Sequence, residues 1–463
     1  MMGIVERRSI RACVTRMSRP QKIGLGVLAF LFILYNLTPY DSPPRSFFRF
    51  QHNVVQDYYQ NALPSDSWLY KPQPYPIDPI NDIGIVIKTG FGTKKRVPAA
   101  LKALSSESLN ADTIVVQDFP LFPDQKNFTL DNGKEVPVID IIGWNLERGA
   151  LSGQEQQERV MKYTTLADAV DGEEWMLADT LGKDMGWELD AMKFLPSLEY
   201  IWHTMPKKKW YVMLDDDTYV IKSSLALLLG HLDYSQPQFI GNPVGDYKGR
   251  FPHGGSSVVM SGAALKKLYD EHPEIVAEGH QESVTAIWGD KLLSTTFMKI
   301  GIYLDETYRR LFNGEPPWMT RMWIDRFCLP LVSFHGLGKD DAMVHVGETF
   351  KNMTEPVFWR QLGKIYGAPS FASFIAEPIR SNVDYVGRLD EYSKTVDKVA
   401  EVDACVKICS DQSSECLAWT FDPGSQKCHI ARWAILGDVA EGRFSGINGQ
   451  LAQKLEDSCH GPA

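Results

Sequence analysis

The chain has 463 residues, a formal net charge of −10 and seven cysteines. That length exceeds one ordinary hydrophobic core, so we expect two folded units with connecting segments. Hydrophobic residues make up 44% and charged residues 23% of the chain, which is normal for a globular protein and excludes broad disorder. The acidic balance argues against nucleic acid as a partner, because affinity for phosphates requires basic patches.

The first forty residues have the pattern of a membrane signal anchor. Basic residues precede an apolar run from Ile23 to Tyr35, which continues weakly to Tyr40. The run is short for a bilayer span of about 20 residues, but thin early-secretory membranes tolerate fewer. Because basic residues stay on the cytosolic side, the sequence predicts a cytosolic tail over 1–22 and a transmembrane anchor over 23–40. A cleaved signal peptide is the competing interpretation, but the basic region is unusually long and no small-residue cleavage site follows.

Cysteines and glycosylation triplets agree with a secretory location. Five of the seven cysteines crowd the tail, whereas Cys13 would be cytosolic and Cys328 lies in the middle of the chain. Dense cysteine in one short segment is typical of a disulfide-bonded module in an oxidising compartment. The triplets at Asn127 and Asn352 permit N-glycosylation. We therefore expect a single-pass type II protein of the Golgi or ER membrane, with its folded domains in the lumen.

A stem should precede the first folded domain. Residues 41–80 are rich in Pro, Tyr, Asp, Ser and Asn without periodicity, so they read as an extended stem. A continuous apolar strand follows at 83–88, and further strands are expected at 113–116 and 138–142 with helical stretches between them. Apolar strands that alternate with helices predict an α/β domain with a buried, mostly parallel sheet.

Three consecutive aspartates follow another buried strand. Residues 210–214 are apolar throughout, and their carboxyl end delivers Asp215, Asp216 and Asp217. Ligands of open α/β sheets bind outside the carboxyl ends of the strands, where carboxylates can share a hard divalent cation with a diphosphate. An added imidazole favours manganese or another transition metal. A solvated acidic turn is the alternative, because Asp is also a common turn residue.

The surrounding sequence resembles a known family. Residues 209–220, KWYVMLDDDTYV, are similar to the core motif of the Fringe-like β-1,3-glycosyltransferases, the group that includes core 1 galactosyltransferases. Other segments agree with that family in the same order, namely 87–90 with 96–98, 187–195, 253–261 and 333–336. The resemblance covers residues 83–350. It implies a Rossmann-like GT-A fold over 81–360, inversion of configuration, UDP-sugar donors and manganese.

The resemblance also assigns the metal ligands. Asp217 and His335 would ligate the cation, and Asp215 is a further candidate ligand. Asp215 or Asp216 would contact the nucleotide or a metal-bound water. His345 is a near rival for the histidine position, and a lone histidine between apolar residues often has only a structural role.

The donor pocket has further candidates. Gly254 and Gly255 would let the donor sugar lie on the backbone, although glycines also serve simply as turn residues with positive φ. Thr89 and Arg96 are candidates for the nucleotide pocket, and the alternative for Arg96 is an ordinary surface charge.

Single-displacement transfer also needs a carboxylate that takes the proton of the acceptor hydroxyl. The family places this acid after the Gly-Gly loop and before a helix. Asp290 aligns best, because residues 291–298 resemble that helix, although the family's paired acids are reduced here to Gly289-Asp290. Glu282 is the alternative base, and helix capping is the alternative role for Asp290.

The tail reads as a separate small module. Cys405 and Cys409 are four residues apart, hence on one helix face, and two short strands flank a Pro-Gly turn at 423–424. This pattern resembles a PAN/Apple module, a small disulfide-bonded α+β domain, over 396–463 behind a linker at 361–395.

The cysteine pairing follows from that resemblance. It implies the bridges Cys405–Cys428 and Cys409–Cys416, although sequence alone leaves three pairings for four cysteines. A zinc site is the rival interpretation, and the lumenal context and irregular spacing favour disulfides. Cys459 has no assured partner.

The leading hypothesis is a Golgi β-1,3-glycosyltransferase that moves galactose from a UDP-sugar to a glycan or glycoprotein, with Mn²⁺ (or Mg²⁺). Transfer of N-acetylglucosamine or glucose is one alternative, and a catalytically silent chaperone or carbohydrate-binding relative is another. Retention of the acids and of His335 argues against silence. An adhesion protein built around the tail would not explain the large α/β domain. Modules like the tail bind protein or carbohydrate, so we hypothesise that it positions acceptors.

Overall fold

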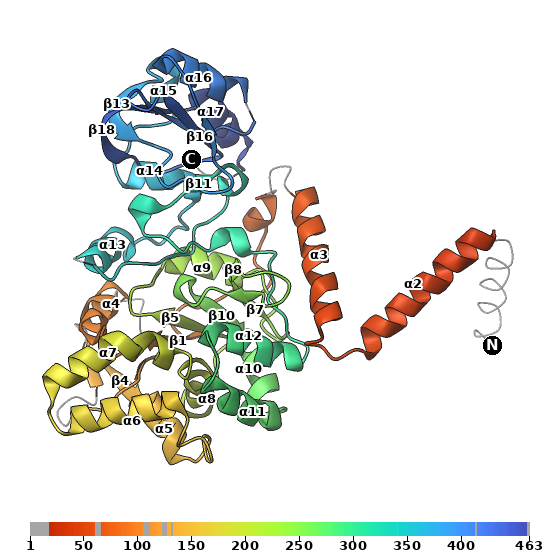
Figure 1. Ribbon diagram of the computed structural model, residues 1–463, viewed down its shortest axis with the longest axis vertical. Helices are drawn as coiled ribbons and strands as arrows, with labels where there is room; N and C mark the ends of the chain where they lie inside the picture. The colour runs from red at the N-terminus through yellow and green to blue at the C-terminus, as the bar shows by residue number, and fades with distance from the viewer. Residues whose placement is uncertain are drawn as a thin grey trace.

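The computed structural model describes residues 18–60, 66–104, 112–122, 127–130, 133–339, 341–412 and 414–460. Most of the expected cytosolic tail, with Cys13, lies outside these residues. Figure 1 shows an N-terminal helix that reaches away from a central α/β domain, and a smaller C-terminal module at one end of that domain.

The central domain is built on a seven-stranded sheet in the order β3-β4-β2-β1-β5-β10-β7. Its strands are β1 (Ile83–Lys88), β2 (Thr113–Gln117), β3 (Asn127–Thr129), β4 (Glu135–Asp140), β5 (Trp210–Asp215), β7 (Phe239–Gly241) and β10 (Val258–Ser261). Strands β4, β2, β1 and β5 are parallel, whereas β3 and β10 run against their neighbours. The predicted α/β class with a mostly parallel sheet is therefore confirmed.

Successive residues of the central strands face opposite sides of the sheet, as the two-residue period of a strand requires. Ile85 and Ile87 of β1 pack into one hydrophobic core, and Val86 between them packs into the other. Val212 and Met213 of β5 divide in the same way. Both faces are therefore buried, which is why these strands are apolar without alternation.

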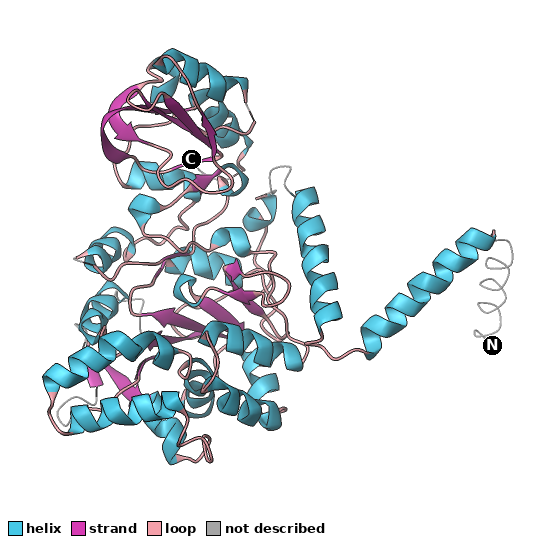
Figure 2. Ribbon diagram, viewed as in Figure 1, coloured by secondary structure: helices cyan, strands magenta, loops and turns pink. Residues whose placement is uncertain are grey.

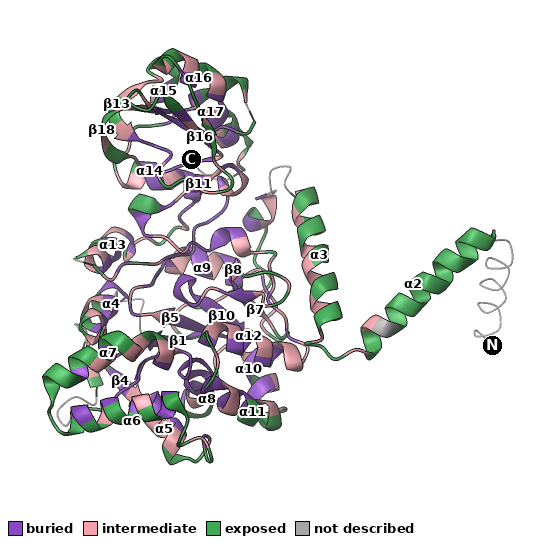
Figure 3. Cartoon of the chain, in the orientation of Figure 1, coloured by how far each residue is buried: buried purple, intermediate pink, exposed green. Residues whose placement is uncertain are grey.

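Helices cover both faces of the sheet (Figure 2). One core takes residues from α4 (Val97–Leu104), α9 (Lys222–Leu229) and α13 (Ala342–Phe350). The other takes residues from α5 (Ile141–Glu147), α6 (Glu158–Asp171), α7 (Trp175–Asp190), α8 (Phe194–Thr204), α10 (Gly262–Tyr269), α11 (Pro273–Ser283) and α12 (Gly289–Lys299). Figure 3 shows the sheet as the most deeply buried layer.

Short elements complete the domain. Two-stranded pairings join β6 (Tyr219–Val220) to β12 (Ser333–Phe334) and β8 (Pro243–Val244) to β9 (Phe251–Pro252). The 3-10 helices are η1 (Ser67–Tyr70), η2 (Lys94–Arg96), η3 (Gly254–Ser256), η4 (Arg309–Leu311), η5 (Pro317–Met319), η6 (Ile324–Arg326) and η7 (Trp359–Gln361).

The N-terminal region holds two helices. Helix α2 (Arg19–Leu37) is long and apolar enough to cross a membrane, and none of its most apolar stretch is buried inside the protein (Figure 3). The helix therefore starts and ends a few residues earlier than the span of 23–40 that we expected. Such a helix is compatible with a signal anchor.

The segment after it is not extended throughout, contrary to our expectation for the stem. Residues Pro43–Gln60 form α3, which lies against the central domain. Asn53 donates a 2.8 Å hydrogen bond to Glu306, and the Asp57 carboxylate pairs with Arg309 and Arg310. The helix was missed because aromatic and polar side chains, rather than aliphatic ones, make its contacts.

The C-terminal module is a five-stranded antiparallel sheet in the order β13-β18-β15-β16-β14. Its strands are β13 (Arg380–Asp384), β14 (Lys394–Val396), β15 (Ala418–Asp422), β16 (Lys427–Ala431) and β18 (Asp438–Ile447), with α14 (Leu362–Ile365), α15 (Ser373–Ala376), α16 (Val402–Asp411) and α17 (Gly449–Ser458) around it. Strand β13 lies in the segment expected to be a linker, so the module takes in residues before 396.

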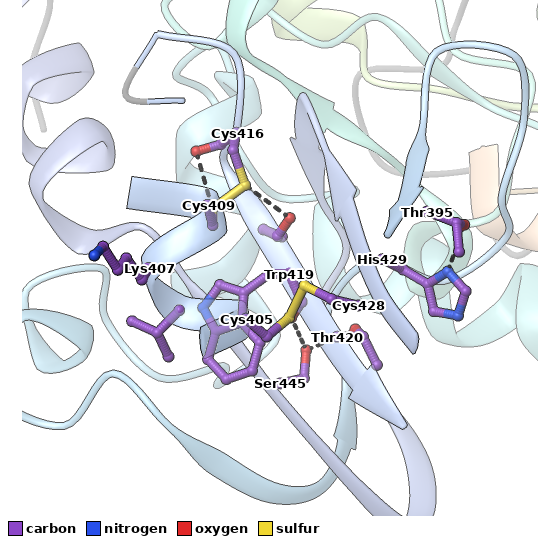
Figure 4. The surroundings of a disulfide bond; sticks show 12 residues. Thr395, Cys405, Lys407, Cys409, Cys416, Trp419, Thr420, Cys428, His429 and Ser445 are labelled. Atoms are coloured by element: carbon purple, nitrogen blue, oxygen red, sulfur yellow. Dashed lines mark hydrogen bonds between the residues drawn. A yellow bond between two sulfur atoms is a disulfide. The ribbon is translucent and has the colours of Figure 1, made fainter. Parts of the chain in front are cut away.

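Two disulfides fasten α16 to this sheet (Figure 4). Cys405 is bonded to Cys428 of β16, and Cys409 is bonded to Cys416 just before β15. Both predicted bridges are therefore confirmed, and the zinc alternative is wrong because all four thiols are consumed.

The module is also joined firmly to the central domain. Strand β11 (Met322–Trp323) pairs with β17 (Trp433–Ala434), and both strands contribute to one continuous hydrophobic core. A third disulfide joins Cys328 of the central domain to Cys459 after α17. Cys459 thus has a partner, which the sequence pattern did not indicate because Cys328 lies far from it in the chain.

Removing the third disulfide should destabilise the folded protein. A bridge between residues 131 apart constrains the unfolded chain strongly, and its loss should cost about 2 to 5 kcal/mol. We expect the double variant Cys328→Ser/Cys459→Ser to unfold at lower temperature in calorimetry, whereas Ser410→Ala on the module surface should match wild type. An unchanged unfolding temperature would contradict this expectation.

Candidate active site

The site lies where β1 and β5 end side by side. The two strands are parallel, and their register pairs Lys88 with Asp215. The carboxyl ends of adjacent parallel strands open toward one cleft, because the chain leaves both strands on the same edge of the sheet. Asp216 and Asp217 follow at once in a turn, which is closed by the Thr218 amide donating to the Asp215 carbonyl. The predicted acidic edge is therefore present.

A distant segment is brought to the same turn by strand pairing. Strand β12 lies antiparallel to β6, with Phe334 opposite Tyr219, so His335 emerges beside Asp217. The Leu337 amide also donates a 3.1 Å hydrogen bond to the Asp217 carbonyl. His335 Nε2 lies 3.3 Å from Asp217 Oδ1.

Asp215, Asp217 and His335 form a potential cation site. One donor atom from each lies within 4.8 Å of the others. Two carboxylate oxygens and an imidazole nitrogen match the ligand preferences of Mn²⁺, whereas Mg²⁺ prefers oxygen alone. The chemistry of these donors therefore fits the expected metal.

The electrostatics keep the carboxylates ionised. Burial opposes ionisation of Asp215 and Asp217, but Lys88 lowers the pKa of the first and His335 lowers the pKa of the second. Burial likewise opposes the charged imidazole, yet the two aspartates raise the pKa of His335 above its ordinary value. A bound cation would compete with that proton, because metal ligands must be deprotonated.

Two buried lysines form ion pairs with Asp215 and with two further aspartates next to it. Lys88 Nζ lies 2.7 Å from Asp215 Oδ1 and 3.0 Å from Asp190 Oδ1. Lys193 Nζ lies 3.0 Å from Asp118 Oδ2 and 3.2 Å from Asp190 Oδ1. Sequence reasoning missed this network. Two features of the sequence could have indicated it. Lys88 ends an apolar strand, and Asp190 and Lys193 lie three residues apart on a helical stretch.

The nucleotide candidates contact the middle aspartate. Thr89 donates a 2.7 Å hydrogen bond to Asp216 Oδ2, and Arg96 lies 3.2 Å from both Asp216 and Asp217. Burial raises the pKa of Asp216 despite these partners. Arg96 is therefore part of the site and not an isolated surface charge.

An open cavity of about 420 Å³ lies over this edge. Thr89, Arg96, the three aspartates and His335 line one side, and Gly182, Gly186 and Trp187 of α7 line another. Its lining includes charged side chains of both signs. Trp187 is largely exposed there, a feature that the sequence pattern did not single out.

The paired glycines pack against the catalytic candidates. A Cβ at Gly255 would lie 2.3 Å from His335 Nε2, so only glycine leaves room for that ring. The Gly254 amide donates a 2.9 Å hydrogen bond to Asp290 Oδ2. Burial raises the pKa of Asp290 to about 6, and Lys88 and Asp190 act on it with opposite sign. Asp290 is thus held by the same glycine pair that packs on His335.

The two rival residues lie in other surroundings. Glu282 accepts a 2.8 Å hydrogen bond from Lys299 between α11 and α12. The His345 ring lies on α13 near Tyr366, and it is His335 that joins the cluster of carboxylates among the described residues. Among the described residues, the structure thus brings His335 to the carboxylates and pairs Glu282 with Lys299.

Comparison with known families agrees with this geometry. Residues 188–286 match the family model described as Fringe-like, and residues 380–441 match that of the PAN domain. A Fringe-like domain implies a glycosyltransferase of the β-1,3 type. The chain therefore contains a Fringe-like domain and a C-terminal PAN domain, as its sequence predicted. The match includes the three aspartates and both glycines, whereas Lys88, Asp290 and His335 lie outside it.

Replacing Gly255 tests the packing at the cation site. Gly255→Ala should displace the His335 ring and weaken Mn²⁺ binding by about 10-fold or more, as disturbed metal-ligand orientation generally does. Electron paramagnetic resonance of free Mn²⁺ would measure this. Gly363→Ala is the matched control, because a Cβ there meets its nearest atom at 3.8 Å. Equal Mn²⁺ affinity in the two variants would count against His335 as a ligand.

Proposed function

We propose that the protein is an inverting, metal-dependent glycosyltransferase. It transfers a sugar, galactose in our expectation, from a UDP-sugar to a hydroxyl of a glycan or glycoprotein, forming a β-1,3 linkage. One observation carries the proposal, namely the convergence of Asp215, Asp217 and His335 at an open cavity in a Fringe-like domain.

Asp215, Asp217 and His335 are the residues that would hold Mn²⁺, or Mg²⁺. When bound, the cation would offset negative charge on the diphosphate leaving group, which replaces the general acid used by glycosidases. Arg96 and Thr89 lie beside Asp216 and would orient the nucleotide. The donor sugar would lie near the Gly254–Gly255 backbone, although the space of the missing Gly255 side chain is taken by the His335 ring.

Asp290 would accept the proton of the attacking hydroxyl. It is held by the Gly254 and Lys291 amides, which donate to separate carboxylate oxygens. Burial raises its pKa to about 6, which suits a base that must be ionised at neutral pH and still attract a proton.

The location proposed for this activity is the Golgi or ER lumen. Helix α2 would cross the membrane with the N-terminus in the cytosol, and three disulfides agree with an oxidising compartment.

Loss of a metal ligand tests the proposal directly. Asp217→Ala should weaken manganese-dependent binding of UDP by about 10-fold or more, because one of three protein ligands is lost. Calorimetric titration of UDP with and without Mn²⁺ would measure the change, and Asp397→Ala on the module surface serves as control. A panel of UDP-sugars incubated with wild type would then name the donor. Absence of manganese-dependent UDP binding in wild type would refute the proposal.

The proposed role of Asp290 predicts the effect of a substitution and the pH dependence of the transfer rate. Asp290→Asn should slow transfer by about 100-fold or more while UDP and Mn²⁺ still bind. With a pKa of about 6, the ionised fraction of Asp290 falls to about a tenth at pH 5, so the wild-type rate should decline as pH falls through 6. Initial rates between pH 5 and 8 give the profile. Wild-type turnover by Asp290→Asn would rule out this base.

A further inference from the structure

A loop of the central domain contacts the candidate metal ligand and, through Arg321, the C-terminal module. Residues 313–320 run beside His335, whose amide donates a 3.3 Å hydrogen bond to the Glu315 carbonyl. Nε2 is the ring nitrogen of His335 that faces Asp217.

The same loop is tied together by a buried amide. The Asn313 side chain donates 2.8 Å hydrogen bonds to the Glu315 carbonyl and to the Thr320 hydroxyl. Thr320 in turn donates to the Pro316 carbonyl. Hydrogen bonds within the loop therefore order the backbone around Glu315, whereas the Glu315 carboxylate pairs with a charged group that follows the loop.

That group is Arg321, which connects the loop to the C-terminal module. Its guanidinium binds both carboxylate oxygens of Glu315, at 2.9 and 3.4 Å, and it pairs with Asp390 of the module. Asp390 Oδ1 meanwhile accepts from the Tyr392 amide, so the acid is fixed within a turn of the module. A forked guanidinium suits this double role, because its donors point in set directions.

Aromatic rings support the guanidinium on its flat side. The Arg321 guanidinium carbon lies 5.2 Å from the centre of the Trp433 ring and 5.7 Å from that of Trp323. The two tryptophans pack on each other at 4.5 Å, and Trp433 belongs to the β17 strand that pairs with β11. The bridge is therefore half-buried and braced, unlike an isolated surface ion pair.

We propose that the C-terminal module is part of the catalytic apparatus, with Arg321 as a positioning residue that sets the metal ligand His335 through Glu315. This inference rests on the proposed function, because it concerns the same cation site. It gives the module a role that differs from our earlier hypothesis of acceptor positioning. A positioning role also agrees with the shared hydrophobic core and the disulfide that fix the module to the central domain.

Two variants of the full lumenal chain test the bridge. Arg321→Met removes the charge and keeps the length, whereas Asp390→Asn keeps an acceptor for the Tyr392 amide and so preserves the turn. Each should weaken Mn²⁺ binding by about 10-fold in the presence of UDP, the effect expected when support of a metal ligand is lost. Free Mn²⁺ would be measured by electron paramagnetic resonance. Asp390→Asn decides the question if Arg321→Met does not fold.

Controls separate positioning from general stability. Arg432→Met breaks a more exposed ion pair with Glu415 on the same module and should leave Mn²⁺ affinity unchanged. Arg321→Lys restores the charge without the fork and should recover part of the loss. The double variant Arg321→Met/Asp390→Asn should lose no more affinity than Arg321→Met alone, because both changes break one bridge.

The outcomes are distinct. Weaker Mn²⁺ binding in both bridge variants, with wild-type affinity in Arg432→Met, supports the inference. Unchanged affinity in both bridge variants overturns it and leaves the proposed function standing. A wild-type protein that binds neither Mn²⁺ nor UDP overturns the proposed function and this inference with it.

Discussion

Repulsion among carboxylates gathered at one sheet edge is the constraint that the rest of the structure has to satisfy. Asp215, Asp216 and Asp217 stand at the end of a buried strand, where water screens their charges poorly. Such a group stays ionised only if positive charge lies close to it. Lys88 provides one such charge from the neighbouring strand, and Arg96 provides another beside Asp216 and Asp217.

The same constraint accounts for the residues that surround the three aspartates. Lys88 pairs with Asp215, and Arg96 pairs with both Asp216 and Asp217, at the edge that lines the cavity with His335. Glycine at 255 is required because the imidazole occupies the space of its missing side chain. A divalent cation has the charge complementary to the two carboxylates that face His335.

The C-terminal module changes how the domain boundary should be understood. A disulfide, a shared core and a strand pairing join it to the central domain, and Arg321 continues that junction to the backbone beside His335. Truncation at residue 396 would therefore remove Trp433 and other parts of a common core, and it would uncover the central-domain residues packed on them, such as Trp323. Loss of activity after such a truncation would not distinguish acceptor binding from folding.

The sequence by itself determined the parts whose signal is local. The apolar strand before Asp215 specified a buried strand with acids at its end, and the spacing of Cys405 and Cys409 specified a helix face that disulfides fasten to a hairpin. Contacts between remote residues left no such trace. Only the tertiary structure decided that Cys459 meets Cys328 and that Lys88 meets Asp215, because strand order and domain packing set those distances, and neither is written in the spacing of residues along the chain.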